Sequence, residues 1–181
     1  MRTDSYTSEG IVLARRNFGE ADRILWVYSK SRGRVALIAK GIRRPKSRKR
    51  GHLEIFARVN FQAVRSKNLD LMLEAEVIDA YPEIRRGLKK VSLAYYICEV
   101  VGKITHEQEA NPELYNLILE NLEKLKLSKK LKELRLDFVR DILVLTGYWP
   151  NDKKLSDPDA KLEEVIERQL YSSRVGKIIS S

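Results

Sequence analysis

The sequence has few of the residues on which disulfides, metal centres and covalent catalysis most often depend. It contains one cysteine, Cys98, and only two histidines, His52 and His106. One cysteine cannot form an intramolecular disulfide, and these three residues are too few for a structural zinc site of about four ligands. Neither histidine adjoins a nucleophile motif, and the nine glycines form no phosphate-binding loop. We therefore predict no catalytic residues, no metal, no cofactor and no enzymatic activity.

Long apolar runs are also missing. No stretch approaches the roughly 18 apolar residues that a membrane-spanning helix needs. The first residues are polar where a signal peptide would be apolar. A hydrophobic fraction of 43% and an aromatic fraction of 8% are typical of a globular protein. We expect a cytoplasmic protein with no membrane partner.

Acidic residues are absent from residues 23–53, and this gap contains the most basic segment of the chain. Seven of the twelve residues from Lys40 to Gly51 are Lys or Arg. Residues 1–80 carry 17 basic residues against 9 acidic ones, whereas residues 81–181 carry 18 against 16. A nucleic-acid backbone would neutralise this excess and release its condensed counterions. The alternative is that the basic segment is a solvated loop without a ligand.

The first 80 residues alternate between apolar and polar positions, as expected for strands with one buried face. Five strands are predicted: about Glu9–Arg16, Arg23–Tyr28, Arg34–Lys40, Leu53–Ala63 and Leu69–Val77. Five short strands joined by tight turns predict a small barrel, and the five-stranded OB-fold fits that count. We expect residues 1–80 to form a nucleic-acid-binding OB-fold domain.

After Tyr81-Pro82, apolar residues recur at a spacing of three and four, which predicts helices. Four helices are expected, starting at Leu88 and at the caps Asn111, Ser128 and Asp157, with Gly147 ending the third. The fold class is therefore α+β, an OB-fold barrel followed by an α-helical bundle. We assign residues 81–181 to the helical domain and expect it to dock partners.

Basic residues that contact phosphates are predicted in the basic segment and at the strand ends beside it. They are Arg15, Arg16, Arg34, Lys40, Arg43, Arg44, Lys46, Arg48, Lys49 and Arg50. Trp26, Tyr28 and Phe56 could stack on bases. We nevertheless expect Trp26 and Tyr28 to form the core face of their strand, because large aromatic residues usually pack inside.

Several segments resemble one family, that of the bacterial recombination mediator RecO. The strongest are Ile11–Leu13, Gly19–Ile24, Gly33–Arg34, Ala39–Ser47 and Leu53–Phe56, followed by Leu73–Glu76, Leu145–Pro150 and, more loosely, Leu170–Arg174. The resemblance implies an OB-fold followed by a helical domain, and binding and annealing of single-stranded DNA. Lys40, Arg43, Arg44 and Lys46 match the basic segment of the family, which implies DNA contacts there.

The same resemblance implies a role in recombinational DNA repair in the bacterial cytoplasm, near the nucleoid. The implied partners are RecR, the single-stranded-DNA-binding protein and RecA, and double-stranded DNA is a further candidate ligand. Many members have a four-cysteine zinc module after the segment that matches Gly147–Pro150, whereas this chain has no cysteine there. The alternative function is that of an RNA-binding OB-fold protein, because phosphate contacts do not distinguish RNA from DNA.

Overall fold

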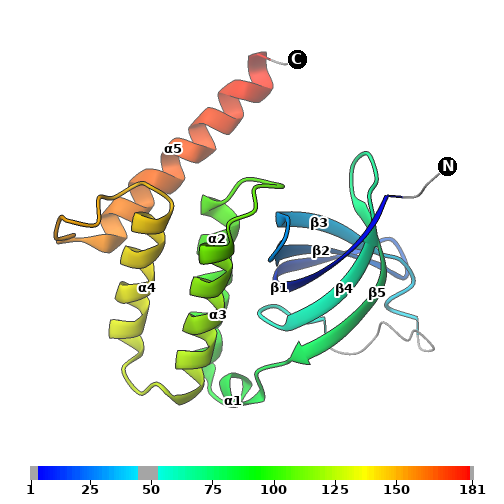
Figure 1. Ribbon diagram of the computed structural model, residues 1–181, viewed down its shortest axis with the longest axis horizontal. Coiled ribbons are helices and arrows are strands. Elements are labelled where there is room, and N and C mark those ends of the chain that lie inside the picture. The colour runs from blue at the N-terminus through cyan, green and yellow to red at the C-terminus, as the bar shows by residue number, and fades with distance from the viewer. Residues whose placement is uncertain (1–3, 45–52, 180–181) are drawn as a thin grey trace. The chain divides into compact units, whose positions relative to one another are not determined.

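The computed structural model describes residues 4–44 and 53–179, with side chains as far as Arg168. Five strands form a closed barrel in the order β1-β2-β3-β5-β4 (Figure 1). They are β1 (Ser5–Phe18), β2 (Asp22–Ser29), β3 (Gly33–Ala39), β4 (Arg58–Val64) and β5 (Asp70–Asp79). All neighbours are antiparallel except β3 and β5, which are parallel. The predicted OB-fold barrel followed by helices is confirmed.

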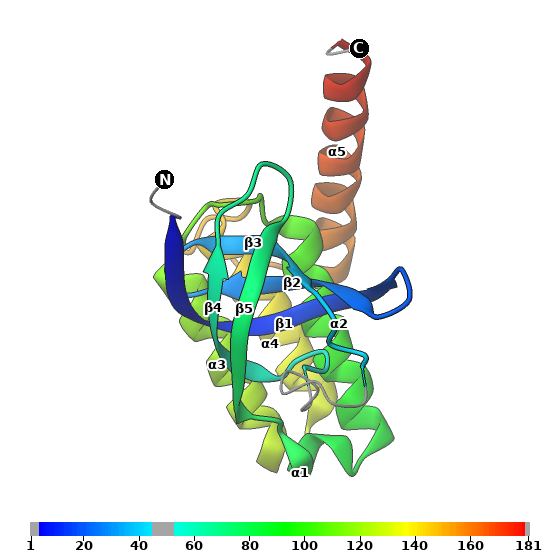
Figure 2. The same ribbon diagram turned by 90° about the vertical axis from the view of Figure 1, so that its right-hand side faces the viewer.

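Strand β1 closes the barrel because it changes partners along its length. Its first half pairs with β4 and its second half with β2, and the change falls at Gly10 and Ile11 (Figure 2). A Cβ atom on Gly10 would lie 2.4 Å from Cγ1 of Val27. Only glycine fits this close approach between strands.

The barrel core is built from the inward positions of the strands. It includes Leu25 and Val27 of β2, Val35 and Leu37 of β3, and Phe61 of β4. The expected period of two is therefore confirmed, because each strand has one face in this core.

Strand β4 starts at Arg58, so the prediction of a strand from Leu53 was wrong for residues 53–57. The reason is a turn at Ile55 and Phe56, where Phe56 has a left-handed φ of 60°. The Phe56 side chain is fully buried, and its amide donates to the Val12 carbonyl over 2.7 Å. Burial of this even-numbered position breaks the alternation that the sequence suggested.

The helices are α1 (Pro82–Arg85), α2 (Leu88–Ile104), α3 (Pro112–Leu127), α4 (Leu131–Leu145) and α5 (Pro158–Ile179). Contacts group the chain into two compact units, Met1–Leu127 and Ser128–Ser181. In the first unit, α2 packs against both β1 and α3 (Figure 1). The domain boundary at residue 80 stays a prediction. None of the described helices has the length and apolar character needed to span a membrane.

Four predicted helix ends are confirmed and one is wrong, and the start at Leu88 is among those confirmed. The Asn111 and Asp157 side chains accept hydrogen bonds from the amides of Leu114 and Ala160, each over 3.0 Å. Gly147 has a φ of 79° just after α4, as a helix stop requires. Ser128 does not cap α4, because the cap position is Lys130 and carries no side-chain cap.

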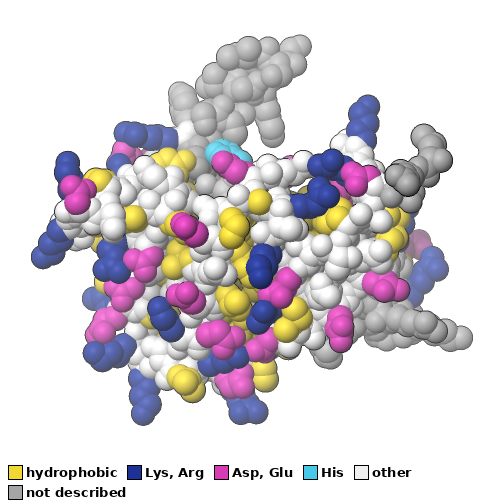
Figure 3. Space-filling model, in the orientation of Figure 1, with side chains coloured by type: hydrophobic (Ala, Val, Ile, Leu, Met, Phe, Trp, Pro, Cys, Tyr) yellow, Lys and Arg dark blue, Asp and Glu magenta, His cyan; other side chains and the backbone are white. Residues whose placement is uncertain are grey.

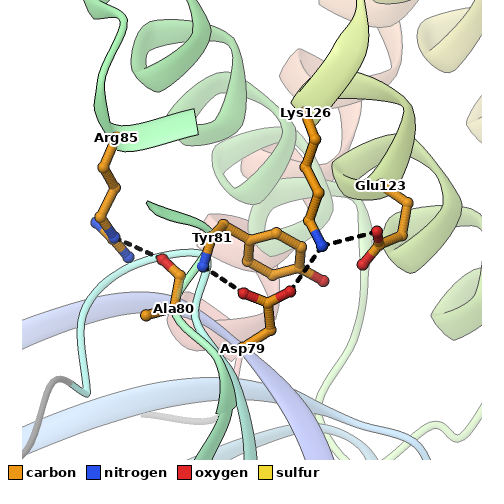
Figure 4. Close-up of polar contacts among 6 residues, drawn as sticks. All are labelled: Asp79, Ala80, Tyr81, Arg85, Glu123 and Lys126. Carbon is orange, nitrogen blue, oxygen red and sulfur yellow. Dashed lines mark hydrogen bonds and ion pairs between the residues drawn. The ribbon is translucent and has the colours of Figure 1, made fainter. Parts of the chain in front are cut away.

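Two polar clusters join the helices of the first unit to the barrel. In Figure 4, Lys126 of α3 donates to Asp79 at the end of β5 over 2.7 Å and pairs with Glu123 over 2.8 Å. The Lys126 Nζ also lies 4.8 Å from the centre of the Tyr81 ring. Because Tyr81 directly precedes α1, this cluster fixes the chain where it leaves the barrel.

The second cluster centres on Glu9 of β1. Its Oε1 accepts hydrogen bonds from Arg58 Nε of β4, over 2.7 Å, and from the Tyr115 hydroxyl of α3. Burial alone raises the pKa of the Glu9 carboxyl, but the bonds from Tyr115 and Arg58 outweigh it, so that pKa lies below its ordinary value. The ionised carboxylate is therefore part of the folded structure.

Candidate nucleic-acid interface

The basic segment begins against the turn between β1 and β2. The Gly41 amide donates to Asp22 Oδ1 over 2.7 Å, and the Arg43 amide donates to the Ala21 carbonyl over 2.9 Å. Arg43 Nη1 also donates to the Gly19 carbonyl over 3.2 Å. These bonds hold the start of the basic segment beside the β1–β2 hairpin, which projects from the barrel in Figure 2.

Three arginines gather at this end of the barrel, and we name Arg15, Arg23 and Arg43 the arginine cluster. Burial, Arg15 and Arg43 all lower the pKa of Arg23, while Glu54 acts in the opposite direction. Arg15 Nη2 pairs with Glu54 Oε2 over 2.8 Å. Two cations and one carboxylate therefore act on Arg23, so a bound anion would relieve the repulsion among the arginines.

The other predicted site residues fall into three groups. Arg16, Lys40 and Arg44 are exposed near the hairpin. Arg34 instead donates from Nη1 to the Gly102 carbonyl in the last turn of α2. Lys46, Arg48, Lys49 and Arg50 lie outside the described residues.

The sequence prediction missed Arg23, the most crowded member of the arginine cluster. The hairpin register pairs Asn17 with Arg23, and Arg23 Nε donates to Asn17 Oδ1 over 3.3 Å. The sequence does contain the information that places Arg23, because the turn of residues 19–21 has a length that fixes the pairing of the two strands. The same register leaves Phe18 at the hairpin end with 49% of its surface exposed.

The predicted orientation of the aromatic residues was wrong. Leu25 and Val27 fill the barrel core, so Trp26 and Tyr28 point to the outer side of β2. Tyr28 is buried there, with its hydroxyl against the Asn111 backbone, whereas Trp26 stays partly exposed. Phe56 is fully buried, so this structure offers no free Phe56 face for a base.

One face of the molecule carries charges of both signs. On the face shown in Figure 3, Lys and Arg side chains are interspersed with Asp and Glu side chains over the described surface. Within the described residues, no group of three His, Cys, Asp or Glu side chains is placed to hold a metal ion. In the part of the chain that the structure describes, the arginine cluster and the start of the basic segment, as far as Arg44, are therefore the candidate interface.

The strand order and the helices define an OB-fold protein with an α-helical extension. The family model of recombination protein O, N terminal, matches residues 1–81, and the C-terminal model matches residues 85–157. The chain belongs to the recombination protein O (RecO) family, and the resemblance seen in the sequence is confirmed.

Three relatives illustrate the similarity. The chain is 35% identical over 145 residues to DNA repair protein RecO of Pelotomaculum thermopropionicum, covering 80% of this chain and 56% of that protein. It is 36% identical over 145 residues to the protein of that name from Desulforudis audaxviator, covering 80% of this chain and 58% of the relative. The match to that of Geobacter metallireducens is 33% over 170 residues, covering 94% and 70%. The chain thus spans little more than half the length of the first two relatives.

Proposed function

We propose that this protein binds single-stranded DNA through the arginine cluster and the basic segment, and that it anneals complementary strands without enzymatic chemistry. The observation that carries the proposal is the convergence of Arg15, Arg23 and Arg43 beside the start of the basic segment. Cations grouped in this way bind phosphates without reading sequence. The family to which the chain belongs, whose relatives are named as DNA repair proteins, supports DNA as the ligand.

Annealing follows from the same electrostatics. Two complementary strands repel each other because both are negatively charged. A protein surface lowers that repulsion when it still carries unneutralised cations after one strand has bound. The basic segment between residues 40 and 51 adds six further Lys and Arg to the arginine cluster, which already includes Arg43. A site of this kind would hold one strand while remaining attractive to the second.

We also propose that the helical residues 81–181 dock protein partners, namely RecR, the single-stranded-DNA-binding protein and RecA. Through these contacts the protein would help to load the recombinase onto DNA. The near balance of 18 basic and 16 acidic residues there gives little attraction toward phosphate and supports protein partners instead. Titration of the 181-residue chain with each purified partner tests this. Binding that requires DNA in every case would contradict a docking surface in this region.

A salt titration tests the DNA-binding proposal. If four to six phosphates are neutralised, the logarithm of the binding constant should fall against the logarithm of salt with a slope of about −3 to −4 for single strands. Fluorescence anisotropy with a labelled oligo-dT measures this slope, and an equal-length RNA serves as competitor. A slope near zero would refute the electrostatic site, and stronger competition by the RNA would refute DNA as the preferred ligand.

A further inference from the structure

An open groove of about 420 Å³ lies outside the barrel, between the first three strands and α2. Its walls include Leu13, Ala14, Trp26, Arg34, Tyr95 and Gly102. All belong to the first compact unit. The groove is therefore a feature of that unit alone, and it is separate from the arginine cluster.

The strand register explains why Trp26 is available in this groove. Its neighbours across β1 and β3 are Ala14 and Ala36, two of the smallest side chains, so neither covers the indole ring. The register shifts between Val12 and Ala14, which makes Leu13 an extra residue. This bulge lets Leu13 and Ala14 both line the groove while Val12 stays in the core.

The polar groups of the groove suit a nucleobase. Arg34 Nη1 donates to the Gly102 carbonyl, but Arg34 Nε is buried and has no hydrogen-bond partner among the described residues. This donor reaches a ring nitrogen or a carbonyl oxygen in the groove only when the Arg34 side chain moves. The acidic Glu99 at the groove is paired with Lys103, so its charge is offset. Tyr95 adds a second aromatic side chain, 42% exposed.

A cation for the backbone lies on the same face of the sheet. Arg16 pairs with Ile24, and Ala14 pairs with Trp26. Arg16 therefore lies two residues, or roughly 7 Å along the strand, from the position opposite Trp26. Arg16 is exposed and is the residue next to Arg15 of the arginine cluster. A phosphate at Arg16 and a base at Trp26 would thus lie on the outer face of the sheet, whereas Arg15 points to the other face.

We propose that this groove holds one unpaired base of the bound strand, stacked on Trp26 and flanked by Tyr95 and Arg34. The inference rests on the proposed function and adds to it a site for a base. Stacking on an aromatic ring tolerates any base, since every base has a π-face. The groove therefore distinguishes a strand with unpaired bases from a duplex, whose bases are stacked on each other.

Tryptophan fluorescence tests the inference directly, because the chain has only two tryptophans. In a Trp149→Phe background, saturation with oligo-dT should quench the Trp26 emission, whereas an abasic strand of equal length should quench it little. Trp26→Leu should weaken oligo-dT binding about five-fold or more and leave abasic binding unchanged. Trp26→Phe, which keeps an aromatic face, should retain most of the affinity.

The outcomes separate this inference from the proposed function. Salt-dependent DNA binding without quenching would overturn the base site and leave the electrostatic site intact. Equal losses for oligo-dT and the abasic strand in Trp26→Leu would also overturn it. If the parent chain binds neither strand, the proposed function fails and the inference fails with it. The quenching measurement needs no Trp26 variant, so it decides the question even if Trp26→Leu does not fold.

Discussion

Replacement of Glu9 by Gln should weaken the attachment of α3 to the barrel. The Glu9 carboxylate accepts bonds from Arg58 Nε and from the Tyr115 hydroxyl, and it pairs with Arg58 Nη2 over 2.7 Å. The Glu9 and Arg58 side chains are 24% and 28% exposed, so solvent screens the pair only in part.

The magnitude follows from these contacts. Hydrogen bonds to charged groups contribute about 1.5–3 kcal/mol each when buried. Partial exposure reduces that value, and the Gln amide oxygen still accepts one bond. We expect a loss of about 1–2 kcal/mol in the free energy of unfolding. For a chain of this size the melting temperature would fall by about 2–8 °C.

Urea unfolding followed by Trp26 fluorescence, in the Trp149→Phe background, reports on the first compact unit. Asp4→Asn is the matched control, because Asp4 and Arg65 are 60% and 49% exposed and 3.5 Å apart. Exposed pairs of this kind contribute about 0–1 kcal/mol. Equal effects of the two substitutions would refute the role of the Glu9 cluster.

The pH dependence gives a second readout. Because the pKa of Glu9 in the folded protein lies below its ordinary value of 4.5, its contribution to stability is fully present above about pH 4.5. That contribution is lost as the pH falls through the folded pKa. The difference between parent and Glu9→Gln should therefore shrink in acid. A difference that grows on acidification would contradict the structure of this cluster.

Three further predictions concern single features. The Tyr81 hydroxyl is buried without a hydrogen-bond partner in the described structure. Tyr81→Phe should therefore leave the free energy of unfolding unchanged within about 0.5 kcal/mol, or raise it. A clear loss of stability in urea unfolding would contradict the absence of a hydrogen bond to this hydroxyl. Because the sequence has one cysteine and two histidines, chelator treatment should not shift the melting temperature, and a stoichiometric zinc equivalent in elemental analysis would contradict this. The third change replaces six residues of the basic segment together by Ser: Arg43, Arg44, Lys46, Arg48, Lys49 and Arg50. Thermal melting should stay near that of the parent, while DNA affinity and annealing should fall strongly at moderate salt. Unchanged binding would mean that the segment is only solvated.

Local patterns were sufficient to predict most of the fold. Period-two alternation identified all five strands, and caps such as Asn111 and Asp157 located two helix starts. Alternation could not say which face of β2 is inside, because Leu25, Trp26, Val27 and Tyr28 are all large and apolar. Only the closure of the barrel decides that question, since it places Leu25 and Val27 against residues far away in the sequence.

The candidate site was only partly predictable for a similar reason. The basic segment is visible in the composition, whereas the arginine cluster depends on how β1, β2 and the Gly41–Arg43 turn meet. Arg23 comes close to Arg15 and Arg43 only through the hairpin register and the bond from Arg43 to Ala21. Arg34 was predicted to contact phosphates because it lies at the start of a strand. Its hydrogen bond to the Gly102 carbonyl could not be predicted, because it depends on the packing of α2 against the barrel.

The most direct test of the central claim is the affinity of the double variant Arg23→Gln, Arg43→Gln for single-stranded DNA. Its control is Lys129→Gln, Lys132→Gln, which removes the same charge from exposed positions of the second compact unit, Ser128–Ser181. At moderate salt, the arginine variant should bind oligo-dT about 5- to 30-fold more weakly than the parent, with a salt slope shallower by about 1.4. The lysine variant should stay within about two-fold of the parent. Equal affinities for the two variants would contradict DNA binding at the arginine cluster.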